Sequence, residues 1–196
     1  MKKLITLFLI LNINANSQSI IDYQKYKIDT TRNEIGNFKL VRLFEYTDSL
    51  LTKDKLYGNV KEFINKTYVS GKHVKIYDDR ENGKFYFETV TKKLIFNNPM
   101  TSCNGGYFKY KMTVYVKDKK VKIVIDNIIH YKGECPFEAI DGSDFGDNFP
   151  IKWDRIAKKY DAKQYQEMKY QAFEEFLIVI NYLDKFSSVK KDDGDF

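Results

Sequence analysis

The sequence predicts an α+β fold, a single domain in which both helices pack on one face of an antiparallel sheet. Alternating apolar and polar residues recur through the middle of the chain, and helical patterns stand before and after this block of strands. Such segregation of strands and helices is typical of an antiparallel sheet with one covered face. We expect the order strand, helix, four antiparallel strands, helix over residues 38–186, after an N-terminal segment at 18–37.

Composition excludes several protein classes. The 196 residues include 33 Lys or Arg and 27 Asp or Glu, for a net charge of +6, and 43% are hydrophobic. This hydrophobic content excludes a disordered chain, and the length is enough for one domain with a core. The long apolar run at 4–11 is too short to span a bilayer, so no transmembrane segment is expected.

The first residues follow the pattern of an export signal. Two lysines precede the apolar run at 4–11, and Ala15 and Ser17 are small residues placed three and one before a cut preceding Gln18. We therefore expect residues 1–17 to be a signal peptide and the protein to be periplasmic or secreted. The alternative is a core strand or helix that begins at the first residue.

The first strand and helix follow the N-terminal segment. Apolar and polar residues alternate from Phe38 to Tyr46, which predicts a strand. Thr52 is a suitable N-cap, and apolar residues at helical spacing predict a helix over 53–68.

Two further strands are expected at 73–77 and 84–96. The polar turn at 78–83 separates them, and a loop is expected over 97–106.

Residues 107–117 and 120–131 predict a hairpin with Asp118-Lys119 as a two-residue turn. This register places apolar residues opposite one another: Val116 with Val121, Val114 with Ile123, Met112 with Ile125 and Phe108 with Ile129. A slip by one residue would mix the faces, so the pattern fixes the register. Because Asp-Lys is a poor turn sequence, a bulge near the turn is the alternative.

The last part of the chain predicts a long loop, a helix and a tail. Prolines, glycines and acids fill 132–152, and a helix over 161–186, capped by Asp161, follows. Its apolar stripe consists of Tyr165, Met168, Ala172, Phe176, Val179, Ile180 and Leu183. Residues 187–196 are expected to be a flexible tail.

Three short segments resemble a known family. Leu56-Tyr57 early in the helix, Asp78-Asp79 before a Gly-Lys turn, and the hairpin sequence at 114–120 are similar to those of exported bacterial proteins that carry a domain of unknown function with a TBP-like (TATA-binding-protein-like) fold. The resemblance covers about 38–131 and implies a TBP-like fold. It implies no activity, because a fold does not fix a function.

The two cysteines flank the hairpin. In the predicted register Glu134 lies opposite Cys103, so Cys135 is one residue away from the position that faces Cys103. A bulge at Gly105-Gly106 would absorb the difference, and we expect a Cys103–Cys135 disulfide in an oxidising compartment. Two free buried thiols are the alternative, whereas a catalytic thiol or a metal site fits worse.

The residues that could support catalysis are scattered. Both histidines, His73 and His130, are expected on the solvent face of strands that need not be adjacent. Asp141, Asp144 and Asp147 could hold calcium, but their spacing misses the EF-hand pattern and a solvated acidic loop is the simpler interpretation. The sequence therefore predicts no enzyme, no cofactor and no metal.

The sheet face away from the helices is the best candidate for a function. Tyrosine offers rigid contact area with a polar tip, which suits recognition. A solvated strand face with ordinary Tyr and Lys content is the competing interpretation. The expected binding residues are Tyr77, Tyr86, Tyr107, Lys109, Lys111 and Tyr115.

Two functions from different classes remain open. The first is an exported, non-catalytic binding module whose tyrosine–lysine face engages an envelope protein, a peptide or an anionic glycan. The second is a periplasmic inhibitor or immunity-type protein that acts through the acidic loop at 134–147. Nucleic acid is not an expected partner, because acids are mixed among the lysines and the chain carries an export signal.

Overall fold

The fold is described from a computed structural model of the chain. It describes residues 21–69, 74–97, 102–134, 142, 144–146 and 157–188. The expected signal peptide lies outside the described residues, as do His73 and Cys135.

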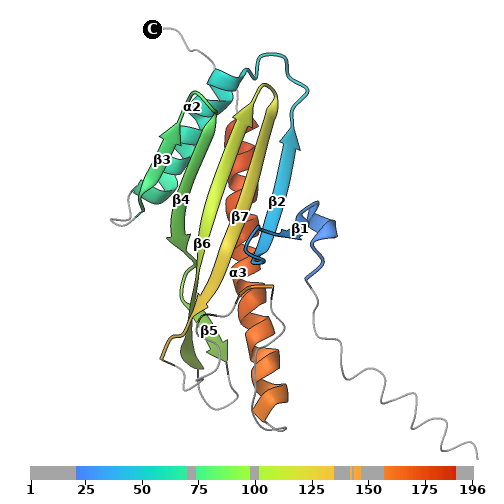
Figure 1. Cartoon of the computed structure of the whole chain (residues 1–196), viewed down its shortest axis with the longest axis vertical. Coiled ribbons are helices and arrows are strands. Elements are labelled where there is room, and N and C mark those ends of the chain that lie inside the picture. The colour runs from blue at the N-terminus through green and yellow to red at the C-terminus, as the bar shows by residue number, and fades with distance from the viewer. Residues whose placement is uncertain are drawn as a thin grey trace, which may run out of the picture.

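Seven strands form an antiparallel sheet (Figure 1). The order across the sheet is β1-β2-β7-β6-β4-β3, and β5 pairs with the start of β6. The strands are β1 (Asp29–Arg32), β2 (Phe38–Glu45), β3 (Ile76–Asp79), β4 (Lys84–Val90), β5 (Leu94–Asn97), β6 (Ser102–Lys117) and β7 (Lys120–Tyr131).

Two long helices lie behind the sheet in the view of Figure 1. Helix α2 (Lys53–Ile64) runs on into a π-helical turn, η2 (Asn65–Val69), and α3 (Ala157–Ser188) follows the length of the sheet; a short 3-10 turn, η1 (Gln24–Tyr26), precedes β1. The Thr52 hydroxyl accepts a hydrogen bond from the Lys55 amide, as the N-cap prediction requires. The α+β fold with both helices on one face is therefore confirmed.

The core lies between the sheet and these helices. Phe85, Phe87, Met112 and Val114 on the central strands are at most 1% exposed. The predicted stripe of α3 is buried there, and Val179 packs against the same core. The opposite face of the sheet is therefore left without a covering layer among the described residues.

The expected strand over 84–96 is two strands. At the break, the Thr91 amide donates to the Phe108 carbonyl (2.9 Å) and the Phe108 amide donates to the Thr91 hydroxyl (3.0 Å). The hydroxyl thus takes the place of a backbone acceptor. In β5 the register is irregular between Leu94, which pairs with Gly106, and Ile95, which pairs with Asn104. The predicted end of the loop over 97–106 was wrong, because β6 already begins at Ser102.

Secondary structure extends further than expected before β2 and at both ends of α3. The N-terminal segment contributes β1, which pairs with β2. Helix α3 begins at Ala157, so Asp161 lies within it and not at its cap. Ser187 is fully buried and its carbonyl accepts a hydrogen bond from the Asn59 side chain (3.0 Å), so the flexible tail cannot begin there.

Candidate functional site

The hairpin of β6 and β7 forms the centre of the exposed face, and its register decides which side chains reach that face. Near the turn the prediction is confirmed: Val116 pairs with Val121 and Met112 with Ile125. The Asp118-Lys119 turn is also confirmed, with Lys119 at φ 57°. No bulge interrupts the described pairs next to the turn.

A bulge lies further along the hairpin. Lys111 pairs with Asp126 but Lys109 pairs with Ile129, so β7 carries one extra residue between them. Asn127 has a φ of 51°, a left-handed conformation that asparagine tolerates better than most residues. Its side-chain oxygen accepts hydrogen bonds from the amides of Asn33 (2.8 Å) and Asn37 (3.2 Å), which hold it in place.

The bulge reverses the faces of the residues beyond it. His130 pairs with Phe108, is fully buried, and its Nε2 lies 2.9 Å from the Gly105 carbonyl oxygen. The expected exposed His130 and the pairing of Phe108 with Ile129 were therefore wrong. Tyr131, which an unbroken register would bury, is 40% exposed on the outer face instead.

The acidic loop at 134–147 is partly built into the fold. Asp144 is 8% exposed, and its carboxylate accepts hydrogen bonds from the backbone amides of Phe38 (3.1 Å) and Gly146 (2.8 Å). The prediction that Asp144 is solvated was therefore wrong. Its carboxylate has a structural role. Asp141 and Asp147 lie outside the described residues.

The bulge also moves the cysteine register in the expected direction. Beyond it, Tyr107 pairs with Tyr131 and the Glu134 amide donates to the Asn104 carbonyl (2.9 Å). The displacement comes from Asn127, not from the expected bulge at Gly105-Gly106. Because Cys135 lies outside the described residues, the pairing stays a prediction.

All six expected binding residues belong to the uncovered face, in two groups. Tyr77 pairs with Tyr86, and their rings stack with centroids 4.3 Å apart. Lys111 and Tyr115 stand beside them on β6. Lys109 and Tyr107 lie further along β6, where Tyr107 stacks on Tyr131 with centroids 5.4 Å apart.

Lysines cover the tyrosine rings of the first group. The Lys75 ammonium lies 5.5 Å from the centre of the Tyr77 ring, and the Lys111 ammonium lies 5.2 Å from that of Tyr86. Lys84 lies 5.6 Å from the rings of both Tyr86 and Tyr115. We call this group the tyrosine–lysine patch, consisting of Lys75, Tyr77, Lys84, Tyr86, Lys111, Tyr115 and Lys122.

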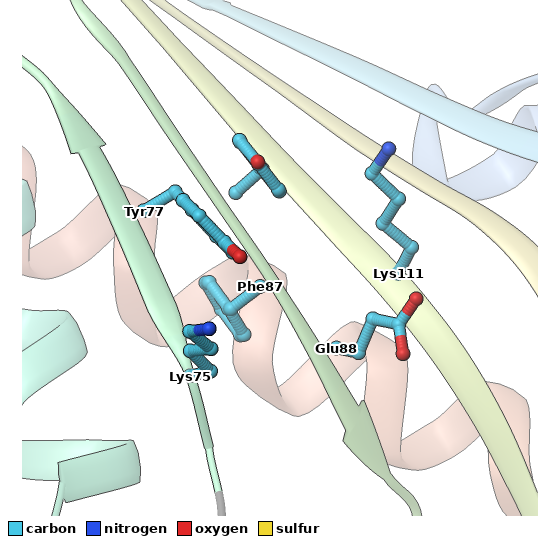
Figure 2. Close-up of a pocket in the computed structure, with 6 residues that line it drawn as sticks. Lys75, Tyr77, Phe87, Glu88 and Lys111 are labelled. Atoms are coloured by element: carbon cyan, nitrogen blue, oxygen red, sulfur yellow. The ribbon is translucent and has the colours of Figure 1, made fainter.

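Two hollows open on the patch. The first, about 390 Å³, is drawn in Figure 2: Tyr77 and Lys75 line one side, and Glu88 and Lys111 the other. The second, about 420 Å³, lies between Tyr115, Leu43 and the lysines of the hairpin turn. Both volumes fall in the range of small-ligand sites.

Comparisons with known proteins agree with this fold. Residues 49–131 match the family model described as a domain of unknown function (DUF4468) with TBP-like fold. This stretch is similar to a DUF4468 domain. The resemblance inferred from the sequence and its TBP-like fold are thereby confirmed. A comparison with curated proteins gives no match.

Two solved structures are similar to the whole domain. A DUF4468 family protein from Bacteroides ovatus has a TM-score of 0.58 at 12% identity, with 89% of this chain and 100% of that chain covered. A TBP-like protein from Parabacteroides distasonis has a TM-score of 0.53 at 14% identity, with 74% and 91% covered. At these identities the likeness shows the fold alone.

Most acids on the outer face of the sheet form ion pairs or hydrogen bonds. Glu88 pairs with Lys109 at 2.7 Å, and this hydrogen bond raises the pKa of the Lys109 ammonium. Glu45 pairs with Lys120 at 2.5 Å. Asp79 accepts hydrogen bonds from the Asn82 side chain and backbone, which lower the pKa of its carboxyl.

Asp126 is the exception among these acids. Burial raises the pKa of its carboxyl, while the nearby charges of Lys111 and Lys39 oppose the rise. Its Oδ1 is buried without a hydrogen-bond partner among the described residues. The carboxylate form is thus poorly stabilised at the junction between the two groups.

No group of three or more metal-ligating side chains occurs among residues with described positions. Within the same residues, no helix has the length and hydropathy needed to cross a membrane.

Sequence reasoning missed two residues of the uncovered face as candidates. Lys84 is a turn-flanking lysine in the sequence, and only the pairing of β4 with β6 brings it between Tyr86 and Tyr115. The predicted register would bury Tyr131, and the bulge places it on the outer face instead. The asparagine at 127, next to an otherwise apolar alternation, was the available signal.

Proposed function

We propose that the protein is an exported, non-catalytic binding module that uses the uncovered sheet face. The observation that supports this proposal is the tyrosine–lysine patch, where stacked rings, ammonium groups and two hollows occupy one side of the sheet. Helices bury the other side, so the patch is a broad surface held by a rigid scaffold. Rigid aromatic contact area of this kind is typical of recognition surfaces.

Export is part of the proposal and comes from the pattern of residues 1–17. Such a protein would meet partners of the cell envelope or the surroundings of the cell. N-terminal sequencing of the protein recovered from cells is expected to start at Gln18.

The stacked tyrosines provide the test of the binding surface. The chain and its Tyr77→Ala/Tyr86→Ala variant are immobilised and exposed to envelope extract, and retained components are identified by mass spectrometry. We expect a component that the unaltered chain retains and the variant loses, because the variant removes one wall of the first hollow. Thermal unfolding followed by circular dichroism checks that the variant is folded.

A matched control uses two exposed tyrosines of α3, on the helix side of the molecule. Tyr170 and Tyr182 are 40% and 62% exposed, so Tyr170→Ala/Tyr182→Ala removes similar aromatic area elsewhere. This control is expected to retain the component. Equal retention by both double variants would refute the sheet face as the binding surface.

A further inference from the structure

The chemistry of the patch restricts what it can bind, and this inference rests on the proposed function. Strands β4, β6 and β7, which carry most of the patch, are paired on both sides, so their backbone groups are engaged within the sheet. Tyr77 lies on the edge strand β3. Over these three strands the face offers only side chains, and a peptide cannot add there as a strand. Strand addition needs a free edge, and the edges of this sheet are β1 and β3.

The tyrosine rings do not form an open apolar platform. Tyr77 and Tyr86 stack on one another, and lysine ammonium groups lie over the rings. A ligand entering the first hollow thus meets ammonium and hydroxyl groups (Figure 2). These groups donate hydrogen bonds, and the ammonium groups attract negative charge.

The balance of charge favours an anion. Glu45 and Glu88 are paired with lysines outside the patch, at the turn and beside Tyr107. In the described structure no ion pair engages Lys75, Lys84 or Lys111. Lys75 and Lys111 line the first hollow, and Lys84 lies over the neighbouring Tyr86 ring, so an anionic ligand would complement their positive charge.

Glu88 argues against a dense polyanion. Glu88 lines the first hollow, and its carboxylate lies beside Lys111 in Figure 2. Closely spaced phosphates or sulfates would be repelled there, whereas sugar hydroxyls can donate hydrogen bonds to a carboxylate. A sugar acid supplies both a carboxylate for the lysines and hydroxyls for Glu88.

The two hollows lie next to each other, joined by Lys84 over the rings of Tyr86 and Tyr115. An oligomer with one charge per sugar ring can occupy both at once, and a single small anion cannot. We propose that the patch binds a glycan built of uronic acid residues, whose carboxylates lie against the lysines.

Oligogalacturonate of about six residues is the probe, and its fully methyl-esterified form is the neutral control with the same sugar. Isothermal titration with the full chain is expected to show binding at least tenfold tighter for the acid form. The Lys75→Gln/Lys111→Gln variant is expected to weaken it about tenfold. Lys55→Gln/Lys185→Gln removes equal charge from α2 and α3 and is expected to leave the affinity unchanged.

Several outcomes would overturn the uronate proposal. These are no binding, equal binding of the methyl ester, equal loss in the α2/α3 control, or tighter binding of poly-glutamate or heparin. If oligogalacturonate fails while capture from envelope extract still depends on Tyr77 and Tyr86, only the ligand class is wrong. If that capture is also independent of the two tyrosines, the binding face itself is wrong.

Discussion

The two halves of the β6–β7 hairpin differ in how their strands pair. In the turn half, from Lys111 to Asp126, the two strands pair without a shift, and apolar residues alternate with polar ones except at Val124. In the open half an extra residue, Asn127, shifts the pairing by one. The partner of β7 also changes there, from β2 to a bridge with Asp144. A register predicted from alternation therefore holds only while both strands keep the same neighbours.

The largest expected effect on stability comes from deleting a single residue in the turn half of the hairpin. Deleting Lys122 moves Val121 out of register with Val116, and both are at most 1% exposed. Burial of one valine side chain is worth about 1.5–3 kcal/mol, so if both valines lose their burial the free energy of unfolding is expected to fall by about 3–6 kcal/mol. Urea unfolding followed by circular dichroism measures it.

The matching deletion in the open half is expected to be mild. Removing Asn127 restores plain alternation, so Ile128 and His130 stay inside and Tyr131 stays outside. The cost is the two hydrogen bonds from Asn33 and Asn37, about 1–2 kcal/mol in total. An Asn127 deletion as harmful as that of Lys122 would show that the bulge is not a simple insertion.

This contrast also explains how far the sequence alone could predict the molecule. The helices, the sheet and the turn half follow from periodicity, and the outer positions of Tyr77, Tyr86 and Tyr115 follow with them. The faces of His130 and Tyr131 could not be predicted. They depend on a left-handed Asn127 that is held by side chains 90 or more residues away in the chain.

Strand β1 and the break at Thr91 were missed for a related reason. β1 is four exposed residues without alternation, and it forms because β2 offers an edge. At Thr91 a hydroxyl replaces a backbone acceptor. Neither feature could be predicted from the local sequence, because strand β1 and the break at Thr91 both depend on contacts with other strands.

A disulfide between Cys103 and Cys135 would fix the open half in its shifted register. Closing a loop of about thirty residues is worth about 3–4 kcal/mol in the chain-entropy model. We therefore expect reduction by dithiothreitol to lower the free energy of unfolding by this amount, measured by urea titration.

The Cys103→Ser/Cys135→Ser variant serves as the control for that measurement. It is expected to match the reduced protein and to show no response to dithiothreitol. Alkylation of both thiols in the untreated protein, detected by intact mass, would contradict the disulfide and with it the shifted pairing at the hairpin's end.

The smallest expected effect lies where the two halves meet, at Asp126. Burial raises the pKa of its carboxyl above the value of about 3.9 in an unfolded chain, so the folded state favours the protonated form. Its contribution to stability is present below pH 4 and is lost as the pH rises through the folded pKa. Asp126→Asn is therefore expected to raise the urea midpoint slightly at pH 7 and to leave it unchanged at pH 3.

Asp79→Asn is a control of opposite sign on the same face. Hydrogen bonds from Asn82 lower the pKa of the Asp79 carboxyl, so its contribution is present at pH 7 and is lost as the pH falls through the folded value. This variant is expected to lower the midpoint at pH 7. If Asp126→Asn lowers it as well, attraction between Asp126 and Lys111 outweighs the cost of burial, and the junction is held by charge pairing across the strands.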